Sequence, residues 1–346
     1  MGQELRSGER SFVTSTHYPN FGALVISLDF ELHWGVRDKL PVNGSYEANL
    51  RGVWKAVPKI LQTFREFEVA ATWATVGFLF ADSREQMENH SPTLKPDYQD
   101  KQLYPYEEAV GLSEDDDPFH YAPSLIEMIR RCPGQEIGSH TFSHYYCCEP
   151  GQDGASFCQD LQSAVSIARE KGIELKSLVF PKNQYNEHYA EILYHNGISC
   201  YRGNQRAWMY DAGRSVDSNK PFKRLSRLAD TYLNLAGYHT TKWSEVFRGS
   251  NLLCNIPASF YVRPFSPRFE KFDGLRLRRI EQSMRYAATR KQITHLWWHP
   301  HDFGIHIDEN IAFLRRILTS YQELHHTHDM RSLSMIEVAR RLGAAR

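Results

Sequence analysis

Two carboxylates and an imidazole alternate along the chain at Asp29, Glu31 and His33. They continue the apolar run 23–28, which is typical of a buried β-strand. If the strand extends through them, the three side chains share one face, because residues two apart in a strand point the same way. Buried charges need a partner, and a metal ion is an effective one. The alternative is a strand that has already ended in a solvated loop.

A histidine pair four residues apart, His140 and His144, follows the short predicted strand 136–138. On one face of a helical turn, two imidazoles at this spacing can chelate a divalent cation. The chain has 16 histidines, so one such pair is expected by chance about once, and histidines without a metal explain the spacing as well. The place of the pair after a strand favours a site, because α/β folds carry their sites at the carboxyl ends of strands.

A third group of polar side chains follows the apolar strand predicted at 294–298. His299 is a candidate general acid, tuned by a carboxylate such as Asp302. His301 could orient His299 or contact a substrate, and a histidine that merely caps the strand explains it equally well. Trp298 is a candidate platform for a sugar, although a tryptophan within a strand is more often part of the core.

Amide side chains follow another predicted strand, 177–180, in the segment Phe-Pro-Lys-Asn-Gln. Asn183 and Gln184 are candidate substrate-binding residues, because amides form hydrogen bonds with sugar hydroxyls or with an N-acyl group. An ordinary turn explains this segment almost as well. Four strand ends with polar side chains are nevertheless harder to attribute to chance than any one of them.

The elements that position these residues alternate between strands and helices, which predicts a parallel sheet with helical crossovers, in a barrel or a doubly wound sheet. Predicted strands are 23–29, 69–76, 136–138, 177–180, 198–201 and 294–298; predicted helices are 47–69, 124–131, 156–171, 187–196, 276–289, 307–325 and 334–342. We expect a tail at 1–20 and a single domain at 21–346. Two long irregular segments, 81–118 and 203–255, are expected to be lids or a dimer surface.

Composition excludes several classes of function. The 346 residues include 41 basic and 41 acidic ones, and a nucleic-acid partner would require a basic excess. No run approaches the roughly 18 apolar residues of a membrane span, and the N-terminus lacks the apolar region of a secretory signal. The six cysteines have no C-x-x-C spacing, which favours reduced thiols and a cytoplasmic location. The motifs of serine hydrolases, dinucleotide-binding proteins and P-loop proteins are absent from the sequence.

The order of these segments resembles the polysaccharide deacetylases, which are the NodB-homology proteins or family-four carbohydrate esterases. The resemblance runs from about residue 22 to 304 and rests on Asp29 with Glu31, on the His140-Thr-Phe-Ser-His144 segment, on the segment 180–184 and on Leu296-Trp-Trp-His299. It implies a distorted (β/α) barrel, here with long irregular insertions. It also implies that Glu31, His140 and His144 hold one divalent ion, with zinc expected, that Asp29 is the base and that His299 is the acid.

Two departures from the pattern of that family matter. Its acidic motif usually has adjacent aspartates, whereas here Phe30 separates Asp29 from Glu31, so the roles of base and ligand could be reversed. The usual arginine-containing groove motif is replaced by Pro-Lys-Asn-Gln, which weakens the case for a chitin-like polymer. Arg202 could supply the missing cation and is a candidate substrate-binding residue.

The resemblance leads us to expect N-deacetylation of an amino sugar by a metal-dependent amide hydrolase. Long variants of this kind resemble cytoplasmic members that act on nucleotide- or lipid-linked sugars in surface-polysaccharide synthesis, such as that of O antigen. Two alternatives stay open, a sugar N-deformylase with the same site and a catalytically inactive sugar-binding module. The sequence does not give the oligomeric state, and a homodimer is one option.

Overall fold

The computed structural model of the chain describes residues 18–210, 213, 220–246 and 253–344. Of the predicted N-terminal tail, 1–20, only the last three residues lie within this part. Strands and helices alternate through most of it, as the sequence predicts.

The described strands form one ten-stranded sheet. They are β1 Ala23–Phe30, β2 Ala71–Thr75, β3 Gln135–Ser139, β4 Ser177–Val179, β5 Cys200–Arg202, β6 Thr241–Lys242, β7 Cys254–Asn255, β8 Phe260–Tyr261, β9 Gln292–Trp298 and β10 Arg331–Leu333. The order is β6-β9-β1-β2-β3-β4-β5-β7, while β10 pairs with β1 and β8 with β9. The β6–β9 pair is antiparallel and the others are parallel. This curled sheet confirms the predicted distorted (β/α) barrel.

Strand β1 lies at the centre of the sheet, between β9 and β2. All eight of its residues are buried, which is characteristic of a parallel strand covered on both faces. In the register, Leu28 pairs with Trp298 of β9, and Asp29 pairs with Ala74 of β2. Because the strands are parallel, the ends of β1, β3, β4, β5 and β9 converge at one edge of the sheet. The predicted site residues lie in the last residues of these strands or in the segments that follow them.

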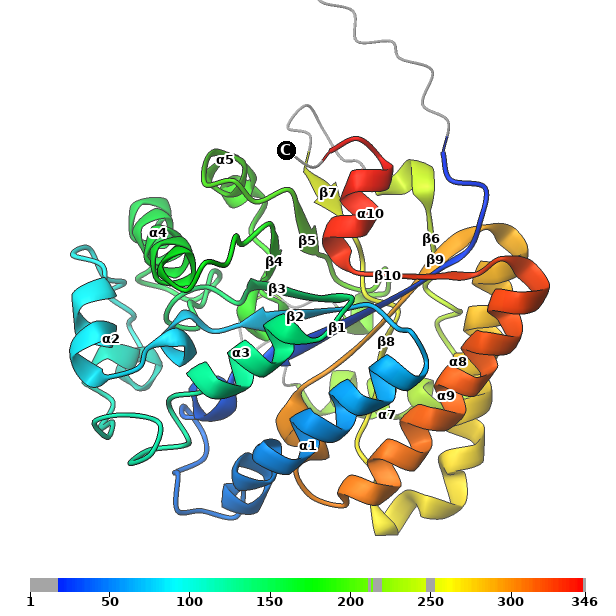
Figure 1. The fold of residues 1–346 in the computed structure, drawn as a ribbon, viewed down its shortest axis with the longest axis horizontal. Coiled ribbons are helices and arrows are strands. Elements are labelled where there is room, and N and C mark those ends of the chain that lie inside the picture. The colour runs from blue at the N-terminus through cyan, green and yellow to red at the C-terminus, as the bar shows by residue number, and fades with distance from the viewer. Residues whose placement is uncertain (1–17, 211–212, 214–219, 247–252, 345–346) are drawn as a thin grey trace, which may run out of the picture.

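Helices lie around the outside of the strands (Figure 1). They are α1 Glu47–Glu66, α2 Arg84–His90, α3 Pro123–Arg131, α4 Gly154–Glu170, α5 Ala190–His195, α7 Pro221–Leu233, α8 Asp273–Arg290, α9 Ile307–His328 and α10 Met335–Arg341. Helix α1 illustrates why they form, since Leu50, Val53, Val57, Ile60, Leu61 and Phe64 make an apolar stripe and all of them are buried. The stripe repeats every three to four residues, so one face of the helix packs on the sheet.

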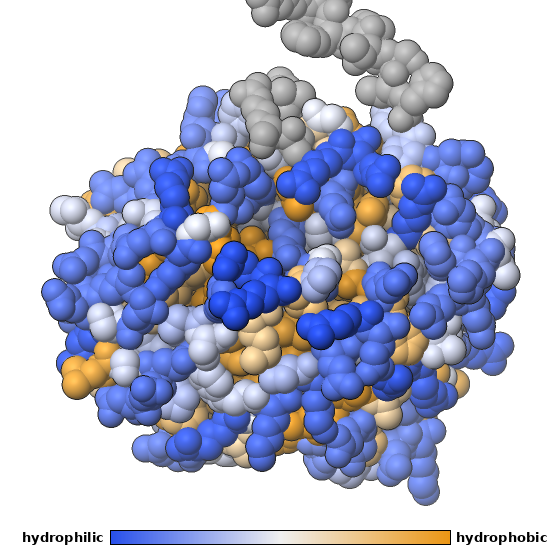
Figure 2. Space-filling view, in the orientation of Figure 1, coloured by the Kyte–Doolittle hydropathy of each residue, from blue (hydrophilic) through white to orange (hydrophobic). Residues whose placement is uncertain are grey.

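The two segments predicted to be irregular contain more regular structure than expected. Segment 81–118 includes α2 and two short 3-10 turns, and segment 203–255 includes α7, β6 and β7. Residues 211–212, 214–219 and 247–252 of the second segment lie outside the described residues. Polar residues cover most of the face drawn in Figure 2, with apolar residues showing between them. Of the described helices, none is long and apolar enough to cross a membrane.

Candidate active site

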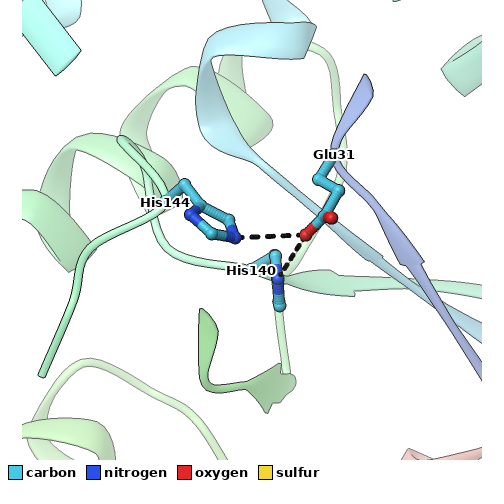
Figure 3. A group of neighbouring side chains, drawn as sticks. All are labelled: Glu31, His140 and His144. Carbon is cyan, nitrogen blue, oxygen red and sulfur yellow. Dashed lines mark hydrogen bonds and ion pairs between the residues drawn. The ribbon is translucent and has the colours of Figure 1, made fainter. Parts of the chain in front are cut away.

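Glu31, His140 and His144 come together at the edge where β1 and β3 end. The Oε2 atom of Glu31 lies 3.2 Å from Nε2 of His140 and 3.1 Å from Nε2 of His144. Both imidazoles point toward the carboxylate (Figure 3), and all three residues are at most 4% exposed. Residues 109 and 113 positions apart in the chain thus form one compact group, as the sequence predicts.

The histidine pair is not carried by a helical turn, contrary to the prediction. The segment from His140 to His144 is a loop in which Thr141 and His144 have left-handed backbone conformations, with φ of 62° and 57°. The Thr141 hydroxyl accepts the backbone N–H of Tyr145 and donates to the His140 carbonyl. These bonds turn the loop so that both imidazoles face Glu31.

The carboxylate of Asp160, on α4, stabilises this loop by hydrogen bonds. It accepts the backbone N–H groups of Phe142, at 2.7 Å, and Ser143, at 3.2 Å, together with the Ser143 hydroxyl. The side chain is fully buried, and burial raises its pKa to about 6. The sequence held no sign of this role, because the aspartate lies on a helix well beyond the histidine motif.

We expect Asp160→Ala to weaken metal binding by about 10- to 100-fold, because outer contacts orient the residues that hold the ion. Titration with zinc against a competing chelator measures the change. Glu170→Gln, an exposed position near the end of the same helix, is the matched control. Equal affinities in the wild type and Asp160→Ala would show that the loop keeps its shape without this carboxylate.

The hydrogen bonds of the histidines indicate that a cation belongs between them and Glu31. Nδ1 of His140 lies 2.9 Å from the Val179 carbonyl, which can only accept, so Nδ1 carries the proton. With Nδ1 bonded to the carbonyl, Nε2 is the ring nitrogen of His140 that is left to bind a metal ion, and it faces the Glu31 carboxylate. Nδ1 of His144 is buried and has no hydrogen-bond partner among the described residues. Burial, partly offset by Glu31, lowers the pKa of this residue to about 4.

The spacing of these atoms fits a small divalent ion. Ligand atoms about 2.0–2.2 Å from one tetrahedral zinc lie about 3.3–3.6 Å apart, slightly farther than the two separations seen here. Burial opposes the charge of Glu31, but His299, His140 and His144 outweigh it and hold the pKa of this residue well below its ordinary value. Glu31 is therefore ionised at neutral pH, as a metal-binding carboxylate must be.

Asp29 is held by Arg202 rather than by the histidines. Arg202 of β5 donates to both carboxylate oxygens, at 2.6 and 2.8 Å, and also to Ser27 and Asn183. Burial opposes the charge of Asp29, but Arg202 outweighs it and lowers the pKa of the carboxyl. Arg202, for which substrate contact was predicted, is not among the residues that line the cavity; it is buried and its guanidinium faces Asp29. It positions Asp29.

His299 and Asp302 form a second hydrogen-bonded pair, next to the Asp29–Arg202 pair. Nδ1 of His299 lies 2.8 Å from Oδ2 of Asp302, and the same oxygen accepts the Tyr261 hydroxyl at 2.7 Å. Nε2 of His299 faces Asp29 at 3.9 Å and Glu31 at 3.7 Å. Burial favours neutral imidazole, but the carboxylates, Asp302 first, raise the pKa of His299 to about 9. Asp302 therefore orients the histidine, as the sequence suggests.

His301 lies against His299, with ring centroids 4.8 Å apart and planes at 7°. With Glu31 and His299 it forms another group that could hold a metal ion. However, its Nε2 is 3.9 Å from Glu31, which is a longer separation than those of His140 and His144. The tighter group is the better candidate, and His301 lines the adjoining cavity, where substrate contact was predicted.

The other predicted substrate-binding residues differ in where they lie. Asn183 lines the cavity. Gln184 is 1% exposed and bonds to Glu149 and to the backbone of Cys148, so it supports the loop instead. The prediction for Trp298 is wrong, because its ring is fully buried between Phe64 and Phe303. Its neighbour Trp297 lines the cavity, with Arg202 4.3 Å from its ring centroid.

His33 does not share the face of Asp29 and Glu31. Strand β1 ends at Phe30, and Leu32 has a left-handed conformation with φ of 45°, so the chain turns away. Nδ1 of His33 lies 2.9 Å from His120, and its Nε2 lies 2.8 Å from the Leu40 carbonyl. This second histidine cluster is held by its own hydrogen bonds, apart from the metal group.

A cavity of about 540 Å³ adjoins the Asp29–Arg202 pair and the His299–Asp302 pair. Asp29, Glu31 and His299 line it, together with Trp297 and His301. The volume lies within the range of roughly 300–1,000 Å³ that small-molecule sites have. The geometry therefore provides an ionised carboxylate, a protonated imidazole and a group suited to a divalent ion at one end of a ligand-sized cavity.

Comparisons with known proteins identify the fold. No protein-family profile matches the sequence, and no curated protein matches it either. Among solved structures, a polysaccharide deacetylase of Mycobacterium smegmatis superposes with a TM-score of 0.59 at 15% identity, over 94% of this chain and 92% of that one. The chain has the NodB-homology polysaccharide deacetylase fold. A polysaccharide deacetylase of Pseudomonas aeruginosa shares it, with a TM-score of 0.52 and 11% identity over 92% of this chain and 89% of that one.

The same fold also serves an allantoinase, PuuE, with a TM-score of 0.52 at 13% identity, over 99% of this chain and 98% of that one. At such identities the likeness concerns the fold alone. The NodB-homology fold therefore leaves the reaction open, and the function has to be argued from the side chains of this site.

Proposed function

We propose that the chain is a metal-dependent amide hydrolase that removes an N-acetyl group from an amino sugar. The observation that carries the proposal is the convergence of three parts on one end of the cavity. These parts are Asp29 held by Arg202, His299 held by Asp302, and the group of Glu31, His140 and His144. Each part corresponds to one requirement of amide hydrolysis, namely a base, an acid and an electrophile.

Glu31, His140 and His144 would hold the ion, and zinc is the proposed ion because one carboxylate and two imidazoles suit it. When bound there, such an ion polarises the acyl carbonyl and makes water more acidic. Asp29 accepts the proton that water loses as it attacks the acyl carbon, and Arg202 keeps both carboxylate oxygens in place. His299 gives its proton to the amine nitrogen as the C–N bond breaks, because an amide anion is too poor a leaving group.

The sequence resemblance supports a proposed setting for this reaction, and the size of the cavity supports a small substrate. We propose a small amino-sugar substrate in the cytoplasm, an intermediate of surface-polysaccharide synthesis such as that of O antigen. The cavity is suited to a mono- or disaccharide unit rather than to a long polymer. Removal of a formyl group would use the same residues, and the released acid, acetate or formate, distinguishes the two activities.

Metal content tests the proposal. We expect about one zinc or similar divalent ion per chain in the purified protein, and its loss in the double variant His140→Ala/His144→Ala. His326→Ala/His328→Ala removes two exposed histidines of α9 and is the matched control that keeps the ion. N-acetyl and N-formyl amino sugars are then screened for release of acid.

A protein that neither contains nor takes up a divalent ion would overturn the proposed mechanism. The inactive sugar-binding module would then be the better reading, because the cavity would remain without its electrophile. Binding of an ion by both double variants alike would also count against the proposal, since the ion would then be held elsewhere.

A further inference from the structure

The cavity continues from its catalytic end to a wall of four arginines. We call Arg227, Arg263, Arg276 and Arg279 the arginine wall; they come from α7, from the segment after β8 and from α8, and all four line the cavity. The reaction proposed above has no use for these cations. A cluster of guanidinium groups inside a ligand cavity therefore requires another explanation.

Arg279 has an internal partner that accounts for it. Its Nη2 donates to Asp230 at 2.6 Å, and that carboxylate is fully buried and also accepts the Tyr210 hydroxyl. The guanidinium lies over the ring of Phe260, 4.4 Å from its centroid. Arg279 is thus neutralised within the fold and gives the wall its shape.

Arg276 is buried and has N–H groups that form no hydrogen bond with the described residues. It is 3% exposed, and its Nη1 donates to the carbonyls of Arg263 and Pro264. Asp273 lies 3.0 Å from its Nη2, but neither Nη2 nor Nε makes a hydrogen bond. A buried, unsatisfied N–H of a charged group is costly, so a ligand that accepts from it would be stabilising.

Arg263 brings a charge that no acid among the described residues compensates. Its Nε donates to the Thr231 hydroxyl at 3.1 Å, and within the described residues no carboxylate comes within 4 Å of its guanidinium. It also repels Arg227 and Arg276 and contributes, after burial, to a lowered pKa of each. An anion bound beside Arg263 would reduce this repulsion.

Tyr261 connects this wall to the catalytic end. The Arg263 guanidinium lies 5.7 Å from the centroid of the Tyr261 ring, and that ring lies 6.0 Å from the ring of His299. Two side-chain contacts therefore separate Arg263 from the imidazole. One small ligand can reach both ends of the cavity.

We propose that the arginine wall binds a phosphate group of the substrate whose acylamino group lies at Asp29 and His299. The inference rests on the proposed function and specifies its substrate class as a phosphate-bearing amino sugar. Phosphate fits better than a carboxylate because its oxygens accept several N–H groups at once and its double charge offsets more than one guanidinium. A sugar phosphate, a nucleoside diphosphate sugar and a lipid-linked sugar all present this chemistry.

Binding of inorganic phosphate tests the wall independently of catalysis. Calorimetric titration of the full chain is expected to show binding that falls roughly 10- to 100-fold in Arg263→Ala, the usual cost of losing a charge-assisted hydrogen bond. Arg263→Lys keeps the charge and should recover part of it. Arg278→Ala removes an exposed arginine of the same helix as Arg276 and Arg279 and should bind phosphate like the wild type.

The variant His140→Ala/His144→Ala separates the two ends of the cavity, and we expect it to bind phosphate like the wild type. Phosphate binding that disappears in this variant, but not in Arg263→Ala, would place the anion at the metal group and overturn the inference. Absence of phosphate binding by the wild type would overturn it as well.

Hydrolysis of three probes identifies the source of the phosphate. N-acetylglucosamine, its 1-phosphate and UDP-N-acetylglucosamine carry the same amide and differ in their phosphates. We expect Arg263→Ala to raise KM for the two phosphorylated probes by more than for the plain sugar. Whichever phosphorylated probe has the higher kcat/KM with the wild type shows whether the wall prefers a phosphate monoester or a diphosphate. Equal effects on all three would contradict the inference. Phosphate binding without hydrolysis of any amide would instead leave the wall in place and remove the proposed function.

Discussion

Asp29→Asn is expected to lower kcat by about 100- to 10,000-fold while leaving the bound ion in place, since general acid–base groups contribute about that much. Asparagine has nearly the size of aspartate but cannot accept a proton from water. Both oxygens of Asp29 bond to Arg202, whereas one oxygen of Glu31 contacts both histidines. The substitution therefore removes the base and spares the metal group. Turnover of an amino-sugar substrate and metal content are measured on the same preparation.

Glu31→Gln is the matched comparison, because it makes the same chemical change two residues further along. This variant is expected to bind the ion weakly, since a neutral amide replaces the carboxylate. The sequence alone left the roles of Asp29 and Glu31 interchangeable, and the pair of variants decides between them. Loss of metal from Asp29→Asn, with metal kept in Glu31→Gln, would reverse the two roles.

Much of this site could be predicted because it lies at the ends of parallel strands. Apolar runs identify β1 and β9, and in a parallel sheet their carboxyl ends must meet at one edge. Asp29, Glu31 and His299 follow those runs directly, so sequence position alone places them together. The separations near 3.1 Å between Glu31 and the histidines could not be predicted, because the loop that brings them there depends on Asp160 of α4.

The partners of the catalytic groups could not be predicted for the same reason. Arg202 is 173 residues from Asp29, and Tyr261 is 41 residues from Asp302. No local spacing encodes such pairings, which exist only once β5, β8 and β9 lie in one sheet. Sequence position suggested only that Arg202 faces the cavity, whereas its ion pair with Asp29 removes it from the cavity wall.

Two further errors concern β9 and α7. Neighbouring side chains of a strand point to opposite faces, and since both Trp297 and Trp298 are apolar, the pattern does not show which one faces the cavity. Helix α7 was missed although Phe222, Leu225, Leu228 and Tyr232 recur at helical spacing. Of its described residues only Asp230 is buried, so this apolar face does not belong to the core that the other helices cover.

His299→Gln is expected to lower kcat by about 100- to 1,000-fold, since the leaving amine would lose its proton donor. In the wild type, kcat/KM should stay level through neutral pH and fall as the pH rises through about 9, the pKa to which Asp302 and its neighbours raise His299. The fall marks loss of the protonated imidazole, so His299→Gln should lack this alkaline limb. The pH profiles of both proteins provide the measurement.

Asp302→Asn tests the cause of that high pKa without removing the imidazole. Asp302 stabilises imidazolium through its charge and its hydrogen bond to Nδ1, so its neutralisation should lower the pKa of His299 and move the alkaline limb to lower pH. Asp308→Asn, an exposed position at the start of α9, should leave the profile unchanged. An alkaline limb that stays near pH 9 in Asp302→Asn would mean that another group gives the proton, because no acid could lose its nearest carboxylate and keep its pKa.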